Sequence, residues 1–417
     1  AGTPDAESAV KLASEPVLGA LAVWTTYVLS RDKSMLEKAY PKIGSVFGDD
    51  LKLVVSGADR REIAYKLTGS PLKELGAEPV YALEFSTYKL LALEIKAMAA
   101  KALGYERDYN GLTEKIAAYT VAFNDCFYDG RLGLYMDRYV SGGFTGVYGA
   151  TSFLPLITSA VNSNDVLDAL LTNLTDEKKF FTRAPVPTLS ADHPAYGKAV
   201  FDKLTYIAPY SGYTGSAVPY LDYMIYSGLV RQGAEKCAEM LSGRLAELNK
   251  EYFLRYASIP DRLLPNYKLD SSGNRDSLSG TLIGLAGASG VLDAEYFGTD
   301  LRPAISFGVL SGGRHSVSGI KMFGRTLSVS VTPDSATLIV NGKKVFEAVG
   351  GGVKVRRFAE RKNGMDFYIT SPKSLTLTLS YPVFTSEKAA GRVLRFNLAA
   401  GKHRVSVSGK DFIAEKI

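Results

Sequence analysis

The stretch YIAPYSGYTGSAVPYLDYMIYSGLVRQGAEKCAEMLSGRLAEL, residues 206–248, decides the fold class. It opens with tyrosines punctuated by glycine, serine and proline, and apolar residues then recur at helical spacing in two runs, over 217–225 and over 234–248. The short joint at 230–233 ends in a glycine. Two amphipathic helices joined so closely predict an antiparallel helical hairpin, with the aromatic entry as a candidate pocket floor.

The hairpin pattern recurs before residue 293. Long connections rich in glycine, proline or tyrosine separate the pairs, and such connections in a compact domain are usually functional. Besides the central pair, helices are predicted over residues 15–30, 34–47, 81–103, 109–127, 150–162, 166–172 and 276–292. About ten helices arranged in pairs favour a helical toroid.

The hydrophobic period changes from 3.6 to 2 residues near 293–303. Beyond it, Leu327, Val329 and Val331 alternate with polar residues, and Asn341-Gly342 is typical of a hairpin turn. This pattern predicts an antiparallel β-sandwich. We therefore expect two domains, a helical one over 1–295 and a β-sandwich over 304–417, in a chain that is mainly α.

The composition of the 417 residues is that of an ordinary globular protein, with 46% hydrophobic and 22% charged residues. The net charge of +6 is modest and no basic stripe stands out, so nucleic acid is not expected as a partner. No apolar run is long enough for a bilayer, so neither is a membrane. The two cysteines, Cys126 and Cys237, fall on predicted apolar helix faces, which favours buried free thiols over a disulfide. The location stays open, with a soluble cytoplasmic protein favoured over a secreted one.

Tyrosine is unusually frequent, at 25 residues against a single tryptophan. A tyrosine ring combines an apolar face with a hydrogen-bonding tip, which suits sugar rings with their apolar C–H faces and hydroxyl rims. For any single tyrosine, packing between helices is the alternative. The composition is thus consistent with a carbohydrate partner.

Four stretches match, in order, the motifs of one superfamily. The matching residues are Trp24, Tyr27, Asp32 and Tyr40; Phe123, Asp129, Gly133, Tyr135 and Asp137; Phe153, Pro155 and Pro185–Ser190; and Tyr220, Asp222, Tyr223, Tyr226 and Gly228. Over residues 15–292 the chain resembles the six-hairpin glycosidases with an (α/α)6 toroid, above all the group of processing α-glucosidases and mannosylglycerate hydrolases, and more distantly the trehalases. It departs from them at Tyr128, where tryptophan is usual, and in the loss of a Trp and an Arg near 210–217.

The resemblance implies a toroid of six hairpins. Since only about ten helices are predicted, we expect the toroid to lack its first hairpin. The chain is then a piece of a longer protein, or a missing N-terminal segment or another subunit completes the ring.

The resemblance also implies catalytic residues. Glycoside hydrolysis requires two carboxyl groups flanking the scissile bond, one protonated and one ionised. The superfamily's acid is the Asp of an S-G-x-D sequence, and Ser56–Asp59 occupies that place, which makes Asp59 the candidate acid. The alternative is a solvated loop residue beside Arg60, which would lower the pKa of Asp59, the wrong direction for an acid.

The base of the superfamily is the Glu of an E-N-Y triplet, but this chain has Pro265-Asn266-Tyr267. A proline cannot accept a proton. Asp261, Asp270 and Asp276 are near enough in sequence to substitute, with loop solvation as the alternative for each. Either one of these serves or the usual inverting route is lost.

Further residues are candidates for holding the substrate, carboxylates for its hydroxyls and aromatic rings for its faces. They are Trp24, Glu84, Tyr135, Asp137, Tyr210, Tyr213, Asp222 and Tyr267. For Glu84 the alternative is the general preference for negative charge at a helix start. The histidines do not have metal-ligand spacing, so neither a metal site nor a cofactor is expected.

Three functions remain open. The first is an inverting hydrolase of α-linked glycosides. The second is a catalytically lapsed toroid that binds glycans or serves as an assembly module, as Pro265 suggests. The third is a polysaccharide lyase, in which a Tyr or His would abstract a proton.

Overall fold

The computed structural model describes residues 18–48, 50–56, 78–197, 215–258, 262–263, 281–297, 301–311, 313–361, 364–381, 383, 392–409 and 411–417. The chain forms two compact units, which we name the helical unit (18–21 and 40–287) and the sheet unit (22–39 and 288–417). Each is described by itself.

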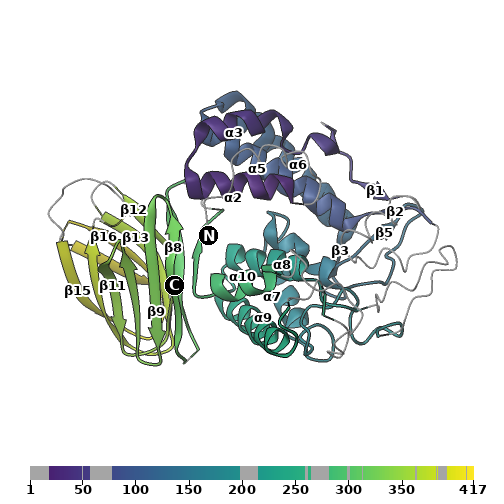
Figure 1. Ribbon diagram of the computed structural model, residues 1–417. Coiled ribbons are helices and arrows are strands. Elements are labelled where there is room, and N and C mark those ends of the chain that lie inside the picture. The colour runs from purple at the N-terminus through teal and green to yellow at the C-terminus, as the bar shows by residue number, and fades with distance from the viewer. Residues whose placement is uncertain are drawn as a thin grey trace. The chain divides into compact units, whose positions relative to one another are not determined.

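The helical unit contains the predicted central hairpin. Its helices are α8, Pro219–Gln232, and α9, Glu235–Tyr256, and they are joined at Gly233, whose φ of 78° lies in the left-handed region that glycine adopts without strain. A second hairpin joins α5, Leu83–Leu103, to α6, Glu106–Phe127, through Gly104, which is also left-handed (Figure 1). These two of the predicted hairpins are therefore confirmed.

The two helices of the second hairpin differ in how they are buried. The sequence of α5 is rich in alanine and aliphatic residues, and most of the residues of this helix are buried, as expected of a core helix. In contrast, α6 buries a single stripe that includes Tyr119, Phe123 and Phe127. Shorter elements complete the unit, namely η1 (Tyr40–Lys42), η2 (Ser45–Phe47), the 3₁₀ helix η4 (Ala150–Ile157), α7 (Asn164–Leu174) and α10 (Thr281–Ser289).

Two contacts hold α5, α8 and η4 together. Gly228 of α8 lies so close to η4 that an added Cβ would be 2.7 Å from the Cβ of Leu156, so only glycine fits. Nearby, an Arg231 nitrogen lies 2.6 Å from Oε2 of Glu94, while Oε1 of Glu94 accepts the Ser159 N–H at 2.6 Å. Because both side chains are largely buried, the ion pair links α5 to α8, and the Ser159 hydrogen bond adds the segment after η4.

Short strands lie beside the start of α5. The order is β1 (Val55–Ser56), β2 (Val80–Tyr81) and β5 (Arg138–Tyr139) in a three-stranded antiparallel sheet. A separate pair joins β3, Tyr128–Asp129, to β4, Leu134–Tyr135. The central strand of the three, β2, comes directly before α5 and pairs with β1 on one side and β5 on the other.

The sheet unit is built on two six-stranded antiparallel sheets, ordered β17-β16-β13-β12-β7-β6 and β15-β14-β11-β10-β9-β8. The strands are β6 (Leu292–Ala294), β7 (Ala304–Val309), β8 (His315–Met322), β9 (Arg325–Thr332), β10 (Ser335–Val340), β11 (Lys343–Val349), β12 (Val353–Arg361), β13 (Gly364–Ser371), β14 (Leu375–Tyr381), β15 (Arg392–Leu398), β16 (Gly401–Ser408) and β17 (Asp411–Lys416).

Aromatic side chains pack between the two sheets. The Phe307 ring of β7 lies 4.9 Å from the Phe346 ring of β11 in the other sheet, and Phe358 and Phe367 join the cluster. Val329 and its alternating partners on β9 are buried as their pattern predicts. The predicted Asn341-Gly342 turn connects β10 to β11, with φ values of 48° and 78°. The C-terminal antiparallel sheet domain is thus confirmed.

Most of α2 (Gly19–Ser30) and all of α3 (Lys33–Ala39) belong to the sheet unit. Trp24 donates its indole N–H to the Tyr296 carbonyl at 2.5 Å, and an Arg31 nitrogen donates to the Leu301 carbonyl at 2.8 Å. The prediction that the chain is mainly α is not confirmed, because the sheet unit contributes two six-stranded sheets. The toroid and the domain limits 1–295 and 304–417 stay predictions.

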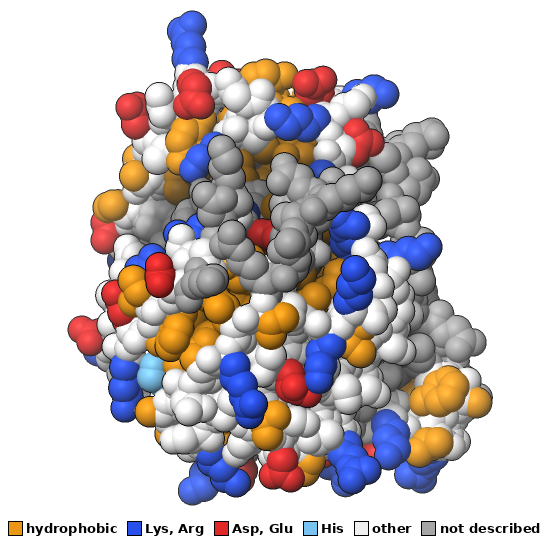
Figure 2. All heavy atoms as spheres, turned by 90° about the vertical axis from the view of Figure 1, so that its left-hand side faces the viewer, with side chains coloured by type: hydrophobic (Ala, Val, Ile, Leu, Met, Phe, Trp, Pro, Cys, Tyr) orange, Lys and Arg blue, Asp and Glu red, His pale blue; other side chains and the backbone are white. Residues whose placement is uncertain are grey.

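The face shown in Figure 2 has a mixed surface. Its described lysine, arginine, aspartate and glutamate side chains are interspersed with hydrophobic ones, without one large field of a single charge. None of the described helices combines the length and the apolar character needed to cross a bilayer.

Candidate functional site

A buried carboxylate joins the starts of α5 and α8. Glu84 lies in the first turn of α5 and is 1% exposed. Its Oε1 accepts hydrogen bonds from the Tyr88 hydroxyl at 2.8 Å and from the Tyr220 hydroxyl at 3.2 Å. Since Tyr220 lies in the first turn of α8, the N-terminal ends of the two helices meet at Glu84. Negative charge is favoured at both ends by the helix dipoles.

The Tyr88 hydroxyl of this cluster is held in its neutral form. Burial, and then the neighbouring Glu84, raise the pKa of Tyr88 well above its usual value. A protonated hydroxyl can donate to a carboxylate, which is what Tyr88 does. The cluster therefore presents a fixed acceptor, Glu84, held by two donors.

Asp137 caps the start of α5. Its Oδ1 accepts the Leu83 N–H at 2.8 Å, and the residue is 3% exposed. Tyr135, two residues earlier, is fully buried, and its hydroxyl donates to the Asn124 side chain at 2.9 Å. Asp137 thus lies at the same helix end as Glu84, whereas the Tyr135 hydroxyl is engaged with α6.

Asp222 is a buried carboxyl group whose pKa is raised by its surroundings. It lies in the first turn of α8, is fully buried, and neither of its oxygens has a hydrogen-bond partner among the described residues. Burial raises the pKa of Asp222 well above its usual value. A buried carboxyl without a partner is costly when ionised, so the neutral acid is the favoured form.

This state of Asp222 predicts a pH dependence. Because its folded pKa lies above the unfolded value of about 3.9, the folded state holds the extra proton and stability falls as pH rises from about 4 towards the folded pKa. Asp222→Asn removes this loss because asparagine does not titrate. The difference in unfolding free energy, variant minus wild type, should therefore increase by about 1.4 kcal/mol for each pH unit in this window. Urea unfolding at several pH values measures it.

Asp125→Asn is the matched control, because Asp125 is exposed on α6. The plot of its unfolding free energy against pH should run parallel to that of the wild type. A parallel curve for Asp222→Asn as well would contradict a neutral buried acid.

Two pairs of described residues connect these helix starts to segments that lie outside the described residues. Ser56 pairs with Val80 just before α5, and Leu263 pairs with Ala217 just before α8. Ala217 also pairs with Pro187, which brings in the central proline-rich segment. The described ends of the loops that contain the candidate acid and base therefore lie at the starts of α5 and α8, which Tyr220 and Glu84 join.

The sequence-derived candidates fall into three groups. The structure brings Glu84 and Asp137 to the start of α5 and puts Asp222 at the start of α8. Trp24 belongs to the sheet unit, where its N–H is used by Tyr296. The remaining candidates lie outside the described residues, namely Asp59, Tyr210, Tyr213, Asp261, Pro265, Tyr267, Asp270 and Asp276.

The two tyrosines around Glu84 were not among the predicted site residues. Glu84 and Tyr88 are four residues apart on one helix, a spacing that places side chains together and could have identified Tyr88. Tyr220 is separated from Glu84 by 136 residues, so only its place in the α8 motif pointed to it. Among the described residues, no group of three or more His, Cys, Asp or Glu side chains is arranged to hold a metal ion.

Comparison with known proteins finds one family model that is similar to part of the chain. Residues 62–257 match the family model described as the mannosylglycerate hydrolase MGH1-like glycoside hydrolase domain. No curated protein sequence matches the chain.

Solved structures are similar to the chain at low sequence identity. A sialidase structure superposes with a TM-score of 0.58 at 14% identity, covering 81% of this chain, which spans only 32% of the sialidase's length. A GH63 mannosylglycerate hydrolase from Thermus thermophilus gives 0.47 at 16% identity, covering 67% of this chain and 76% of that one. The neutral trehalase Nth1 from Saccharomyces cerevisiae gives 0.48 at 11% identity, covering 69% and 63%. The sialidase match supports a shared fold.

Proposed function

We propose that the chain hydrolyses α-linked glycosides with inversion at the anomeric carbon, because residues 62–257 match the model of an MGH1-like glycoside hydrolase domain. The observation that carries the proposal is the hydrogen bond from Tyr220 to Glu84. This hydrogen bond joins the starts of α5 and α8. The proposed acid lies in the segment between Ser56 and α5, and the proposed base lies in the sequence around Leu263, which pairs with Ala217 just before α8. We place the sugar site at these helix starts, at one end of an (α/α)6 toroid.

Asp59 is proposed as the general acid. It follows Ser56 by three residues, and Ser56 is paired to Val80 beside the start of α5. An acid catalyst must hold a proton at the working pH, which requires a raised pKa. Arg60 next in sequence opposes that rise, whereas a position near the Glu84 carboxylate would favour it, because like charges raise the pKa of a carboxyl group.

The base is proposed among Asp261, Asp270 and Asp276, because Pro265 cannot accept a proton. Leu263, which is paired to Ala217, lies between Asp261 and Pro265 in sequence. An inverting enzyme holds its two carboxyl groups about 6.5–9.5 Å apart to admit the attacking water. The side chain that meets this spacing from Asp59 is the base.

The substrate is held, in this proposal, by carboxylates at the helix starts and by aromatic rings around them. Glu84, Asp137 and Asp222 would accept or exchange hydrogen bonds with sugar hydroxyls, as carboxyl groups commonly do in pockets. The proposed aromatic contacts are Tyr135, Tyr210, Tyr213 and Tyr267, whereas Trp24 is left out because it belongs to the sheet unit. A missing N-terminal hairpin or another subunit would complete the toroid.

The glycan-binding alternative is favoured by one observation, the proline at the superfamily's base position. The lyase alternative is weaker at this cluster. A lyase base must lose its proton readily, and burial together with Glu84 raises the pKa of Tyr88 instead.

The products of a reaction with α-linked oligosaccharides separate the three functions. We expect reducing sugar to form without the absorbance of an unsaturated ring. Appearance of that absorbance would establish a lyase. Retention on an immobilised glycan without any product would establish the binding module, and either result would overturn the hydrolase.

A further inference from the structure

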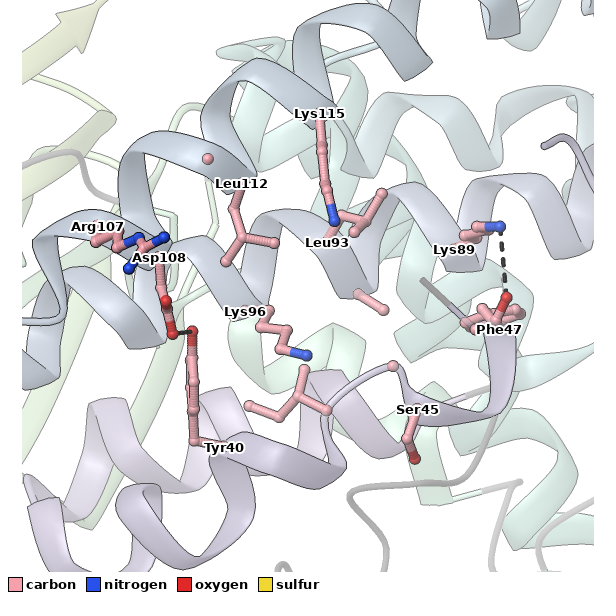
Figure 3. A pocket seen from close by; sticks show the side chains of 15 residues that line it. Tyr40, Ser45, Phe47, Lys89, Leu93, Lys96, Arg107, Asp108, Leu112 and Lys115 are labelled. Atoms are coloured by element: carbon pink, nitrogen blue, oxygen red, sulfur yellow. Dashed lines mark hydrogen bonds between the residues drawn. The ribbon is translucent and has the colours of Figure 1, made fainter. Parts of the chain in front are cut away.

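A basic groove lies between α5, α6 and the segment 40–48 of the helical unit. Figure 3 shows its lining, which comes from the middle of α5, the first half of α6 and the two short 3₁₀ helices η1 and η2. The cavity measures about 290 Å³. On α5, Lys96 follows Glu84 by twelve residues, about 18 Å of helix. The groove begins at Lys89, five residues after Glu84, and extends along α5 away from the helix starts at which we place the sugar.

The groove combines an apolar floor with an aromatic edge. Ile43 and Ala92 are buried, and Leu93 and Leu112 also line it. The Tyr40 ring lies 5.7 Å from the Lys96 ammonium group, within the range of a cation–π contact. Such a floor suits the carbon skeleton of a small organic molecule.

Three cations of the groove, Lys96, Arg107 and Lys115, are not in ion pairs with any described residue. Lys96 and Lys115 extend from α5 and α6 towards the groove in Figure 3, and Arg107 lies at its end. The other charges are occupied, since Lys89 is 2.7 Å from Asp50 and Asp108 accepts the Tyr40 hydroxyl at 2.9 Å. The groove thus has an excess of positive charge.

A glycine keeps the space open. Gly111 lies in α6 between Arg107 and Lys115, at intervals of four residues that place all three on one face. An added Cβ at Gly111 would have nothing within 4 Å. No neighbour requires glycine at this position, so a larger side chain can be introduced at residue 111, and it would extend into the space between the two cations.

We propose that this groove, defined by Tyr40, Lys96, Arg107, Gly111 and Lys115, binds a small molecule that bears a phosphate group. Three cations outside any ion pair with a described residue match a dianion, and Arg and Lys are the side chains that recognise phosphate. The apolar floor and the Tyr40 ring favour a phosphate ester with a compact carbon skeleton, such as a hexose phosphate, over free phosphate. The site does not depend on the proposed hydrolase activity.

Titration calorimetry of the full chain with glucose 6-phosphate and with inorganic phosphate tests the proposal. We expect saturable binding that weakens at least 10-fold in Lys115→Glu and that is lost in Gly111→Leu, which fills the groove. Lys250→Glu makes the same charge change at an exposed position of α9 and should bind as the wild type does. Because Gly111→Leu also removes a glycine from a helix, its melting temperature should rise, which separates lost binding from lost folding.

The two ligands identify the source of the phosphate group. Tighter binding of the ester supports a hexose phosphate, and equal binding of inorganic phosphate supports the same site with the free anion as its ligand. Binding that survives in both Lys115→Glu and Gly111→Leu, or no binding at millimolar concentration, would overturn the proposal.

Discussion

Asp59→Asn is expected to lower kcat for an unactivated α-linked glycoside by about 10²–10⁴-fold, the usual contribution of a general acid. Asparagine keeps the shape of the side chain but cannot give a proton to the leaving oxygen. Sugar affinity should stay within a few-fold of the wild type, because the hydrogen bonds that hold the sugar are proposed to come from other residues. Steady-state kinetics and a separate binding measurement give the two quantities.

The leaving group adds a second test of the same substitution. An activated aryl glycoside needs little protonation, so Asp59→Asn should lose much less activity on it than on the unactivated substrate. Asp125→Asn, on the exposed face of α6, is the control and should change neither. Equal losses on both substrates, or turnover unchanged by Asp59→Asn, would remove Asp59 from the acid role.

Glu94→Gln is expected to lower the free energy of unfolding by about 3–5 kcal/mol, the range for breaking one side of a buried ion pair. Glu94 and Arg231 lie 2.6 Å apart with side chains 7% and 20% exposed, so the substitution removes a close counter-charge from a largely buried guanidinium. Since Glu94 also accepts the Ser159 N–H, the link between α5, α8 and the segment after η4 is weakened at the same time. Urea unfolding followed by circular dichroism measures the change.

Glu251→Gln is the matched control for this substitution. Glu251 pairs with Arg183 at 3.3 Å, but both side chains are more than half exposed. Solvent screening limits such a pair to about 0–1 kcal/mol. A Glu94→Gln loss no larger than the Glu251→Gln loss would show that the buried pair does not hold these elements together.

Local patterns predicted much of the architecture because the forces behind them are local. The helical spacing around Gly233 marks α8 and α9, and the alternation around Val329 marks β9, since each pattern states which face of one element is buried. The turn at Asn341-Gly342 followed from backbone preferences of the same two residues. These features can be predicted without knowing which other elements pack against them.

Other features depend on partners far away in the sequence. Trp24 bonds to Tyr296, 272 residues later, and no periodicity in 15–30 indicates that this helix would join the sheet unit. Likewise, a charge at a helix start explained Glu84 well enough, and only the fold reveals that Tyr220 reaches it. The basic groove was not predicted either, because Lys96 and Lys115 acquire their common function only when α5 packs against α6.

The anomeric form of the sugar first released from an α-linked substrate tests the central claim most directly, and proton magnetic resonance reads it before mutarotation. An inverting hydrolase built on Asp59 and an opposed carboxylate predicts the β-anomer first, with no such signal from Asp59→Asn. The α-anomer as the first product would contradict the account.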